Sequence, residues 1–426
     1  MKNWNDVYKM LENGEMDPSL EQTGCENLEA ARKRAAHVME GFQKCFGTTE
    51  DTPVALCSAP GRTEICGNHT DHQHGRVLAA AVNLDFLACV ALNGTNIVRF
   101  QSEGWPMTTV DLTNLEPQEE EKETTASLVR GVMGSLAKAG YEVAGFDMYA
   151  VSNVLPGSGL SSSAACEILI GTAGNHLFCH DELDAVEIAK IGQKAENIYF
   201  GKPSGLMDQT ASSVGDAVAI DFADPAAPVV RTVQANLADL GLALCIIDCG
   251  ADHAALTGEY ASIPQEMGQV AAYFGKEVLR DVKEEEVLAA LPKLREKVGD
   301  RAVLRALHFY ADDKRAVEEA DALDKKDKET FLNLVKESGR SSWELLQNIT
   351  PAAATTHQDM AVALTVAEKA LNGKGACRVH GGGFAGTIQA FVPLEDVSAF
   401  KKQVETMLTE GCCHILCIRP AGGIIL

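Results

Sequence analysis

The chain has 426 residues, of which 46% are hydrophobic, and its formal net charge at pH 7 is -23. This length predicts about two domains, each with its own core. So acidic a surface repels nucleic-acid phosphates and anionic lipid headgroups, and we therefore expect neither nucleic acid nor a membrane as a partner. It also repels an anionic substrate, unless the active site supplies local donors and cations.

Cysteine usage and hydropathy place the protein in the cell. The 13 cysteines form no repeating framework. Three of them crowd with a histidine at 412–417, but the spacing matches no zinc pattern, and we interpret these thiols as buried in strands. The first residues contain no apolar signal region. The most apolar long stretch, 77–92, is interrupted by Asn83 and Asp85 and is no membrane span. We expect a cytoplasmic protein.

Hydrophobic periodicity and turn residues predict the order of helices and strands. Helices are predicted at 26–46, 161–178 and 183–199, and strands at 53–59, 76–92, 94–101, 146–155, 217–222 and 242–248. The segment from 260 to about 370 is mainly helical. Prolines 264, 292 and 351 are expected to interrupt it. Strand character returns at 378–392 and 414–418.

This order predicts an α+β fold of two closely joined lobes. We place the boundary near residue 222, which gives an N-terminal lobe at 1–222 and a C-terminal lobe at 223–426.

A glycine- and serine-rich stretch follows the strand predicted at 146–155. Its residues are Pro156, Gly157, Ser158, Gly159, Leu160, Ser161, Ser162, Ser163 and Ala164. Glycines let the backbone turn tightly and approach a ligand closely. The serines open a helix, whose free N–H groups and positive dipole end attract phosphate. A plain strand-to-helix turn with a serine cap is the alternative. The stretch lacks the Gly-Lys-Ser/Thr of a Walker A loop.

A second glycine cluster, at 381–386, matches the pattern G-x-G-x-x-G. A dinucleotide-binding loop of that pattern opens a helix early in a βαβ unit. Here the cluster lies near the C-terminus and precedes the apolar, strand-like residues 387–392. We interpret it as a turn between strands that closes over a ligand from the opposite lobe.

Two carboxylates suggest phosphoryl transfer. Asp208 follows the glycine turn at Gly205, and an acceptor hydroxyl needs a positioned carboxylate to take its proton or to orient it. The alternative is that Asp208 caps a helix that begins at Gln209. Glu196 lies near the end of the preceding helix and is a candidate Mg²⁺ ligand, although a glutamate on a helix usually faces water.

A polar cluster at 68–74 follows Arg62 in an otherwise apolar region. Its Asn and Asp side chains can bond a polyhydroxylated ligand. The three histidines, His69, His72 and His74, also permit a metal site. We rank the metal site lower, because alternation along a loop splays these rings apart.

Together these segments resemble the galactokinase branch of the GHMP small-molecule kinases. Residues 60–71 are similar to its first motif, Gly-Arg-x-Asn-x-Ile-Gly-Glu-His-Thr-Asp-Tyr. Residues 157–164 are similar to its nucleotide-binding motif, 381–386 to its third motif, and 205–209 to the stretch with its catalytic aspartate. The resemblance covers nearly the whole chain and implies a two-lobed kinase with the active site between the lobes.

The resemblance also implies roles for single residues. Asp208 is the catalytic carboxylate, and Arg62 stabilises its charge and the transferring phosphoryl group. Mg²⁺ sits between Ser163 and Glu196 and bridges the ATP phosphates. The sugar is bound by Asn68, His69, Asp71, Gly205 and Tyr260. The expected reaction is the ATP-dependent phosphorylation of galactose to galactose 1-phosphate, with the sugar and ATP as partners and a monomer as the favoured state.

The first motif departs from the family pattern. Asn68 and His72 stand where the family has glutamate and tyrosine, and Glu64 stands where it has asparagine. Asn68 offers an amide in place of a carboxylate. Another monosaccharide, such as an amino sugar or a pentose, therefore stays open as the substrate. A non-catalytic sugar sensor is the alternative from another class, but such relatives lose residues of the Ser-Ser-Ala segment, which is complete here at 162–164.

Overall fold

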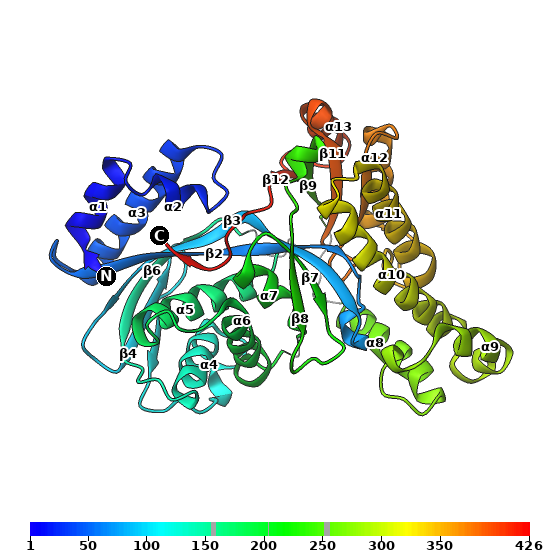
Figure 1. The fold of residues 1–426 in the computed structure, drawn as a ribbon, viewed down its shortest axis with the longest axis horizontal. Helices are drawn as coiled ribbons and strands as arrows, with labels where there is room; N and C mark the ends of the chain where they lie inside the picture. Colours follow the sequence, from blue (N-terminus) through cyan, green and yellow to red (C-terminus); the bar gives the residue numbers. More distant parts are fainter. Residues whose placement is uncertain (155–158, 203, 251–255) are drawn as a thin grey trace.

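The structure is a computed structural model, and it describes residues 1–154, 159–202, 204–250 and 256–426. In this part of the chain, a nine-stranded sheet and a four-stranded sheet are packed with helices. The nine-stranded sheet lies toward the end that holds both termini, and the four-stranded sheet and most of the later helices lie toward the other end (Figure 1). The α+β fold class is confirmed.

The nine-stranded sheet has the path β1-β2-β3-β6-β4-β5, with β13 on β2 and with β7 and β8 beyond β3. Its pairs are antiparallel except β4 with β6. Its strands are β1 (Lys2–Asn3), β2 (Pro53–Cys66), β3 (Arg76–Leu92), β4 (Ile97–Ser102), β5 (Thr108–Asp111), β6 (Phe146–Ser152), β7 (Ala217–Asp221), β8 (Val229–Val233) and β13 (Ile424–Ile425). Strand β3 pairs with β7 through its first residues and with β6 through its last, so it joins the two ends of the sheet.

Strand β2 runs seven residues beyond the end predicted at residue 59, because two register shifts let its pairing with β3 resume. The shifts lie between Pro60 and Arg62 and between Glu64 and Cys66. Such irregularities bend a strand and redirect its side chains, and they are frequent beside active sites. The motif Pro60-Gly61-Arg62 is therefore part of a strand rather than of the loop after it.

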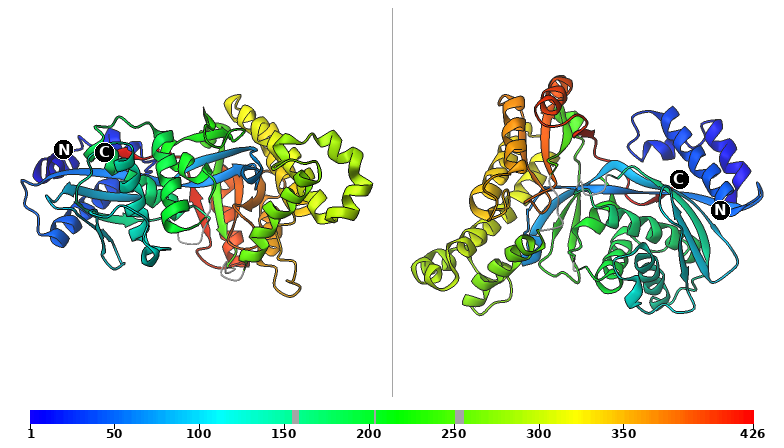
Figure 2. Two further views of the ribbon diagram at one scale, coloured as in Figure 1. Left: turned by 90° about the horizontal axis from the view of Figure 1, so that it is seen from below. Right: turned by 180° about the vertical axis from the view of Figure 1, so that it is seen from behind.

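Helices cover both faces of the nine-stranded sheet. Figures 1 and 2 show α1, α2 and α3 on one face and α4, α5, α6 and α7 on the other. Their bounds are α1 (Trp4–Glu12), α2 (Asp17–Glu21), α3 (Leu28–Phe46), α4 (Thr125–Lys138), α5 (Ser162–Phe178), α6 (Ala185–Lys194) and α7 (Met207–Val214), with the short turns η1 (Asp71–Gln73), η2 (Glu119–Glu121) and the π-helical η3 (Ala195–Phe200). Helix α5 is buried from Ala164 to Asn175, so it forms the centre of the core beneath the sheet.

The second sheet is antiparallel and has the order β10-β11-β9-β12. Its strands are β9 (Leu242–Asp248), β10 (Ala376–His380), β11 (Thr387–Pro393) and β12 (Cys413–Leu416). The helices of this half are α8 (Thr257–Tyr273), α9 (Glu284–Val298), α10 (Asp300–Asp324), α11 (Lys328–Ser341), α12 (Asp359–Leu371) and α13 (Val397–Met407), with the turns η4 (Leu237–Leu240), η5 (Leu279–Asp281), η6 (Ser342–Leu346) and η7 (Leu394–Asp396).

Two of the three predicted helix interruptions are wrong. Pro264 lies inside α8 and Pro292 inside α9. A proline removes one helical hydrogen bond, but buried residues on both sides of Pro264, such as Ile263 and Met267, hold α8 in place. Pro351 lies between η6 and α12, where the helical region is interrupted as expected.

Strand pairing shows where the chain passes from one sheet to the other. The first sheet continues through β8, beyond the proposed boundary at 222, and the second begins with β9. The last strand, β13, returns to β2 (Figure 2). A division into 1–222 and 223–426 stays a prediction.

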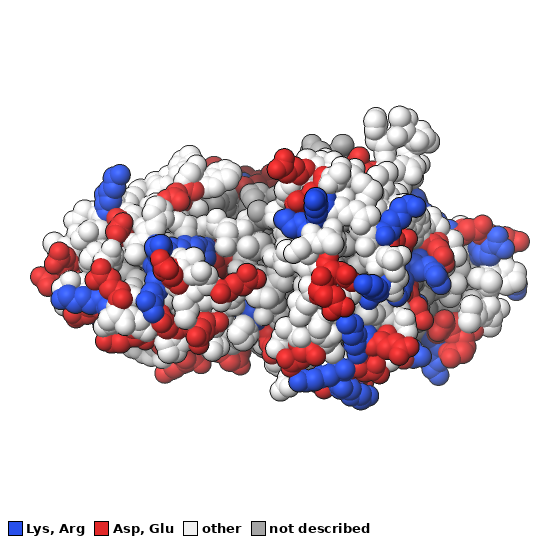
Figure 3. Space-filling view, turned by 90° about the horizontal axis from the view of Figure 1, so that it is seen from above, with Lys and Arg blue, Asp and Glu red and all other residues white. Residues whose placement is uncertain are grey.

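On the face seen in Figure 3, acidic and basic side chains are interspersed rather than gathered by sign. Within the described residues, no helix has both the length and the apolar character that a membrane span requires.

Candidate active site

Arg62 and Asp208 form a two-point ion pair. Arg62 is on β2, and its Nε and Nη2 donate to the two carboxylate oxygens of Asp208 over 2.7 Å each. The Arg62 side chain is 8% exposed, whereas that of Asp208 is 25% exposed, so the carboxylate is the partner that solvent or a ligand reaches. Burial raises the pKa of Asp208, but Arg62 more than offsets this effect, and the pKa lies below its usual value. The carboxylate is ionised at neutral pH.

The first turn of α7 presents Asp208 to the nucleotide loop. The helix begins at Met207, so Asp208 is its second residue and does not cap a helix that begins at Gln209. Its Oδ2 instead accepts a hydrogen bond from the hydroxyl of Ser161. Ser161 has a left-handed backbone and precedes α5. The catalytic candidate and the start of the nucleotide helix are thus in direct contact.

Strand β2 is also hydrogen-bonded to the described end of the nucleotide loop. The backbone N–H of Arg62 donates to the carbonyl of Leu160 over 3.0 Å, and its Nη1 donates to the carbonyl of Gly159. A Cβ on Gly61 would lie 2.8 Å from the Leu160 carbonyl, so only glycine fits there. Ser162 is the first residue of α5 and Ala164 is buried. The predicted loop residues Pro156, Gly157 and Ser158 lie outside the described residues.

The predicted metal ligands are adjacent. Ser163 Oγ donates to Glu196 Oε1 over 3.0 Å, and Glu196 is only 2% exposed. The Lys202 ammonium lies 3.0 Å from the same oxygen. Hydroxyl and carboxylate oxygens are the ligands that Mg²⁺ prefers, so this pair fits the ion by chemistry. The described residues contain no group of three or more His, Cys, Asp or Glu that could hold a metal.

A second carboxylate lies behind Glu196. The Nε2 of Gln209 donates to Glu196 Oε2 and to Glu167 Oε2, over 2.9 Å in each case. Glu167 is fully buried, and burial raises its pKa well above the usual range, with Glu196 adding to the effect. The buried amide of Gln209 therefore bridges the two carboxyl groups, and burial disfavours the charged form of Glu167.

The polar cluster begins with a loop that α10 anchors. The backbone N–H groups of Gly67 and Asn68 both donate to Asp312 Oδ2, over 3.2 and 2.9 Å. His308 Nε2 donates to the Asn68 carbonyl over 3.0 Å. A Cβ on Gly67 would lie 2.5 Å from the Arg76 carbonyl. The loop is therefore fixed at its start by buried groups.

Asp71 brings the polar cluster close to α7. A Cβ on Gly205 would lie 2.6 Å from Asp71 Oδ2. Gly205 is three residues before Asp208, so the bare backbone at 205 allows the Asp71 carboxylate to approach the start of α7. Asp71 Oδ1 accepts from the backbone N–H of His72 over 2.9 Å.

Two of the three histidines of this loop, His69 and His72, lie side by side, with ring centroids 5.5 Å apart, so the expectation that the loop splays these rings apart is wrong for this pair. His69 Nε2 donates to the carbonyl of Gly382 over 3.0 Å. Burial, and after it the neighbouring His72, lowers the pKa of His69 to about 4. The ring is neutral at neutral pH, and its other nitrogen is an acceptor.

The glycine cluster at 381–386 joins β10 to β11, as predicted for a turn between strands. A Cβ on Gly382 would lie 2.7 Å from the ring of Tyr260, whose hydroxyl donates to the Gly383 carbonyl over 2.9 Å. A Cβ on Gly159 would lie 3.2 Å from His380. The turn therefore contacts the polar cluster through His69, and Tyr260 packs on it. His380, the last residue of β10, is the neighbour of the nucleotide loop.

Comparisons with known proteins agree with this geometry. Residues 127–216 match the GHMP kinases N terminal domain, and residues 40–92 match the galactokinase galactose-binding signature. A galactokinase from Streptomyces coelicolor is 31% identical over 373 residues, which cover 87% of this chain and 92% of that protein. A galactokinase from Glaesserella parasuis is 31% identical over 374 residues, which cover 85% of this chain and 91% of the relative.

The chain belongs to the galactokinase branch of the GHMP kinases. It is a sugar kinase and uses ATP.

Solved structures of the family extend the comparison. Lactococcus lactis galactokinase complexed with galactose is 26% identical, with a TM-score of 0.77, over 91% of this chain and 98% of that one. A mevalonate kinase with 15% identity and a TM-score of 0.60, over 85% of this chain and 98% of that one, shares the fold.

Sequence reasoning missed several residues that shape this galactokinase-type site. His308 and Asp312 are four residues apart on α10 and both face the Asn68 backbone. Arg378 on β10 is fully buried and pairs with Glu64 over 3.0 Å. The i,i+4 spacing of a histidine and an aspartate was the one available signal for the first pair. Nothing local to Arg378 indicates its partner, which lies 314 positions away.

Proposed function

We propose that this chain transfers the terminal phosphoryl group of ATP to the C1 hydroxyl of galactose, giving galactose 1-phosphate. The observation that carries the proposal is the Arg62–Asp208 ion pair in direct contact with Ser161 of the nucleotide loop. The match of residues 40–92 to the galactose-binding signature supports galactose as the sugar.

In this proposal, Asp208 orients the sugar hydroxyl and accepts its proton. Its carboxylate is ionised and partly exposed, and it lies at the start of α7. A carboxylate with a lowered pKa is a weak base, so it serves first to orient the sugar hydroxyl and takes the proton only as the new bond forms. The bond from the oxygen to phosphorus then forms as the bond to the ADP leaving oxygen breaks.

Arg62 has a double role. Its guanidinium keeps Asp208 charged before the reaction, and Nη1 holds the Gly159 carbonyl, which fixes the loop. A buried guanidinium at this place also offsets charge on the transferring phosphoryl group without reorganisation. Positioning and charge neutralisation are the main requirements of phosphoryl transfer.

Ser163 and Glu196 would hold Mg²⁺, which would neutralise phosphate charge when bound. Lys202 carries a positive charge at the same carboxylate: its burial lowers the pKa, but Glu196 more than reverses this effect. We propose that Lys202 maintains Glu196 in the ligating position in the absence of nucleotide.

Another monosaccharide is the second candidate, because Asn68 and His72 differ from the family pattern in the sugar motif. The test is ADP release by the purified protein with Mg·ATP and, separately, galactose, glucose, galactosamine, N-acetylgalactosamine and arabinose. We expect turnover with galactose, and a product whose ³¹P and ¹H NMR signals show phosphate on C1. Faster turnover with another sugar would favour the second candidate. Sugar and ATP binding without turnover would favour a sensor.

A further inference from the structure

The side chain of Asn68 uses its whole hydrogen-bonding capacity within the protein. Its Nδ2 donates to Glu64 Oε1 over 2.9 Å and to the Gly381 carbonyl over 2.7 Å. Its Oδ1 accepts from Asn348 Nδ2 over 2.8 Å and from Ser342 Oγ over 3.4 Å. A carboxamide has two N–H donors and two acceptor lone pairs, so all four are engaged. Asn68 is also fully buried.

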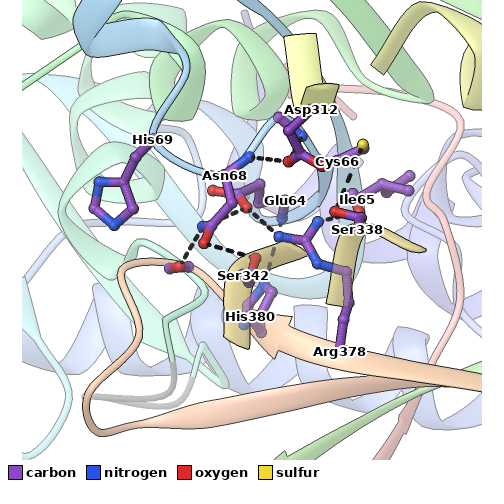
Figure 4. A network of polar contacts seen from close by, with 12 residues as sticks. Glu64, Ile65, Cys66, Asn68, His69, Asp312, Ser338, Ser342, Arg378 and His380 are labelled. Atoms are coloured by element: carbon purple, nitrogen blue, oxygen red, sulfur yellow. Dashed lines mark hydrogen bonds and ion pairs between the residues drawn. The ribbon is translucent and has the colours of Figure 1, made fainter. Parts of the chain in front are cut away.

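Glu64 shares its carboxylate between Asn68 and a buried cation. Its Oε1 also accepts from Arg378 Nη2 over 3.0 Å, and the side chains of Glu64 and Arg378 are 5% and 0% exposed. Arg378 Nη1 donates to the carbonyl of Ile65 (Figure 4). One carboxylate, one amide and one guanidinium therefore form a hydrogen-bonded unit, in which the buried Nε of Arg378 has no hydrogen-bond partner among the described residues.

The unit joins two separate segments of the site, the polar cluster at 68–74 and the glycine turn at 381–386, which together with Glu64 we call the sugar half. Asn68 contacts Gly381, and its neighbour His69 contacts Gly382, so consecutive residues of the loop bind consecutive residues of the glycine turn. In Figure 4 the His69 ring points away from the Glu64–Arg378 pair. The amide of Asn68 therefore binds the turn on the side of the buried Glu64–Arg378 pair, while the ring of His69 lies on the opposite side of the loop.

Positions 64 and 68 exchange two residue types relative to the family motif, which has asparagine first and glutamate second. Here the carboxylate is at 64 and the amide is at 68, and the two side chains bond each other. The charge of the pair is unchanged by the exchange. The two departures in the first motif are thus one coupled departure.

We propose that Asn68 is a positioning residue rather than a sugar ligand, and that Glu64 and Asn68 act as one unit, with Arg378 as its cation, that holds the glycine turn at 381–386 against His69. The proposal rests on the proposed sugar-kinase function. It assigns the sugar contacts of this loop to His69 and Asp71 and leaves Asn68 to set their position.

The balance of charge predicts that neither position tolerates a single change. In Asn68→Glu, a second carboxylate would face Glu64 and the Gly381 carbonyl, which are both acceptors, with one guanidinium to serve two charges. In Glu64→Asn, the buried Arg378 would lose its carboxylate. The double exchange Glu64→Asn/Asn68→Glu restores one carboxylate, one amide and one guanidinium. Restoring the family's glutamate at 68 alone is therefore expected to harm the enzyme.

The experiment compares the wild type, the two single variants and the double variant in a double-mutant cycle. We expect each single variant to raise the KM for galactose at least 30-fold and to lower the urea midpoint of unfolding. The double variant should return the KM to within about fivefold of the wild type and recover most of the midpoint. The KM for ATP should change less than about threefold throughout, because the unit does not contact the described nucleotide loop.

Asn68→Ala keeps the test decisive if a charged variant fails to fold, because it removes the four bonds without adding charge. It should raise the galactose KM at least tenfold, with a smaller effect on kcat, while the exposed Asn333→Ala on α11 is the matched control. An unchanged galactose KM in Asn68→Ala would overturn the positioning role. A double variant no better than the worse single variant would overturn the coupling.

Failure of the proposed function is distinguishable from failure of this inference. If the wild type shows no sugar-dependent ADP release, the proposed function fails. In that case the urea midpoints of the four proteins still measure the coupling of residues 64 and 68. Calorimetric titration with galactose in the absence of ATP still tests the positioning role of Asn68.

Discussion

The site divides into two halves that differ in how closely they follow the family pattern. The half that we propose for phosphoryl transfer, made of Arg62, Ser161, Ser163, Glu196 and Asp208, keeps the residues that the family motifs imply. Each of these side chains lies within hydrogen-bonding distance of another member, including the contact of Ser161 with Asp208, which the sequence did not predict. The sugar half differs from the first motif at three polar positions, 64, 68 and 72, yet the side chains of Asn68, Glu64 and Arg378 still bond partners of opposite hydrogen-bonding character.

This difference predicts how each half responds to substitution. In the phosphoryl-transfer half, the proposed chemistry requires a particular atom at a particular place, because charge would develop there during the reaction. In the buried framework of the sugar half, the requirement is a balance of donors, acceptors and charge. That balance can be met by more than one arrangement of the same residue types.

We expect the largest effect on activity when the negative charge of Asp208 is removed. Asp208→Asn should lower kcat about 10³-fold, because the neutral amide neither takes a proton nor orients the hydroxyl as a carboxylate does. ATP binding, measured by titration of a fluorescent analogue, should be retained. Asp224→Asn, at an exposed turn, is the control. Turnover within tenfold of the wild type would remove Asp208 from the mechanism.

Glu196→Gln tests whether the metal pair belongs to the same half. We expect the Mg²⁺ concentration for half-maximal activity to rise at least about tenfold, because a neutral amide is a poorer ligand for a hard cation. The galactose KM should stay unchanged. Glu182→Gln, which alters an exposed glutamate, should leave both values unchanged. A normal Mg²⁺ requirement would contradict the assignment of Glu196.

Gly205→Ala should separate the halves sterically. The new methyl group would lie 2.6 Å from Asp71 Oδ2, and such overpacking costs about 1–3 kcal/mol. If Asp71 binds the sugar, the galactose KM rises about tenfold or more and the ATP KM changes little. Gly268→Ala on α8, where a Cβ has open space, is the matched control. An equal rise in both KM values would show that the two halves are not separable here.

The smallest expected effect concerns stability and pH. Glu319 on α10 is buried beneath the sugar half beside Cys66, and burial raises its pKa from 4.5 to about 8, with Arg378 offsetting part of the effect. Because the folded pKa is raised, the stabilisation is fully present below pH 4.5 and is lost as the pH rises through about 8.

The free energy of unfolding in urea, measured from pH 5 to 9, should therefore fall between pH 5 and 8 by about 1 kcal/mol or more relative to Glu319→Gln. Asp208 has the opposite sign: its lowered pKa gives stability that is present at neutral pH and lost in acid. Parallel curves for the wild type and Glu319→Gln would show that this carboxyl does not titrate in the range.

Local patterns predicted much of the secondary structure. Helix α3 and strands β3, β7 and β9 lie close to their predicted limits, because each shows a clear apolar period and ends at a turn residue. No prediction covered α1 and α2 at residues 4–21. Strand β2 was predicted too short, because its continuation depends on register shifts against β3, and these have no local signal.

The sequence by itself determined the fold class and the family, and it predicted the residues that we propose for phosphoryl transfer, because motifs of glycine, serine and carboxylate carry their chemistry in local spacing. Only the tertiary structure decided what Asn68 and Glu64 contact. Their partners Gly381, Asn348 and Arg378 come from segments some 280 to 314 positions away. Whether a buried polar group faces a ligand or the protein depends on which atoms the fold brings within 3 Å of it, and local spacing does not specify those atoms.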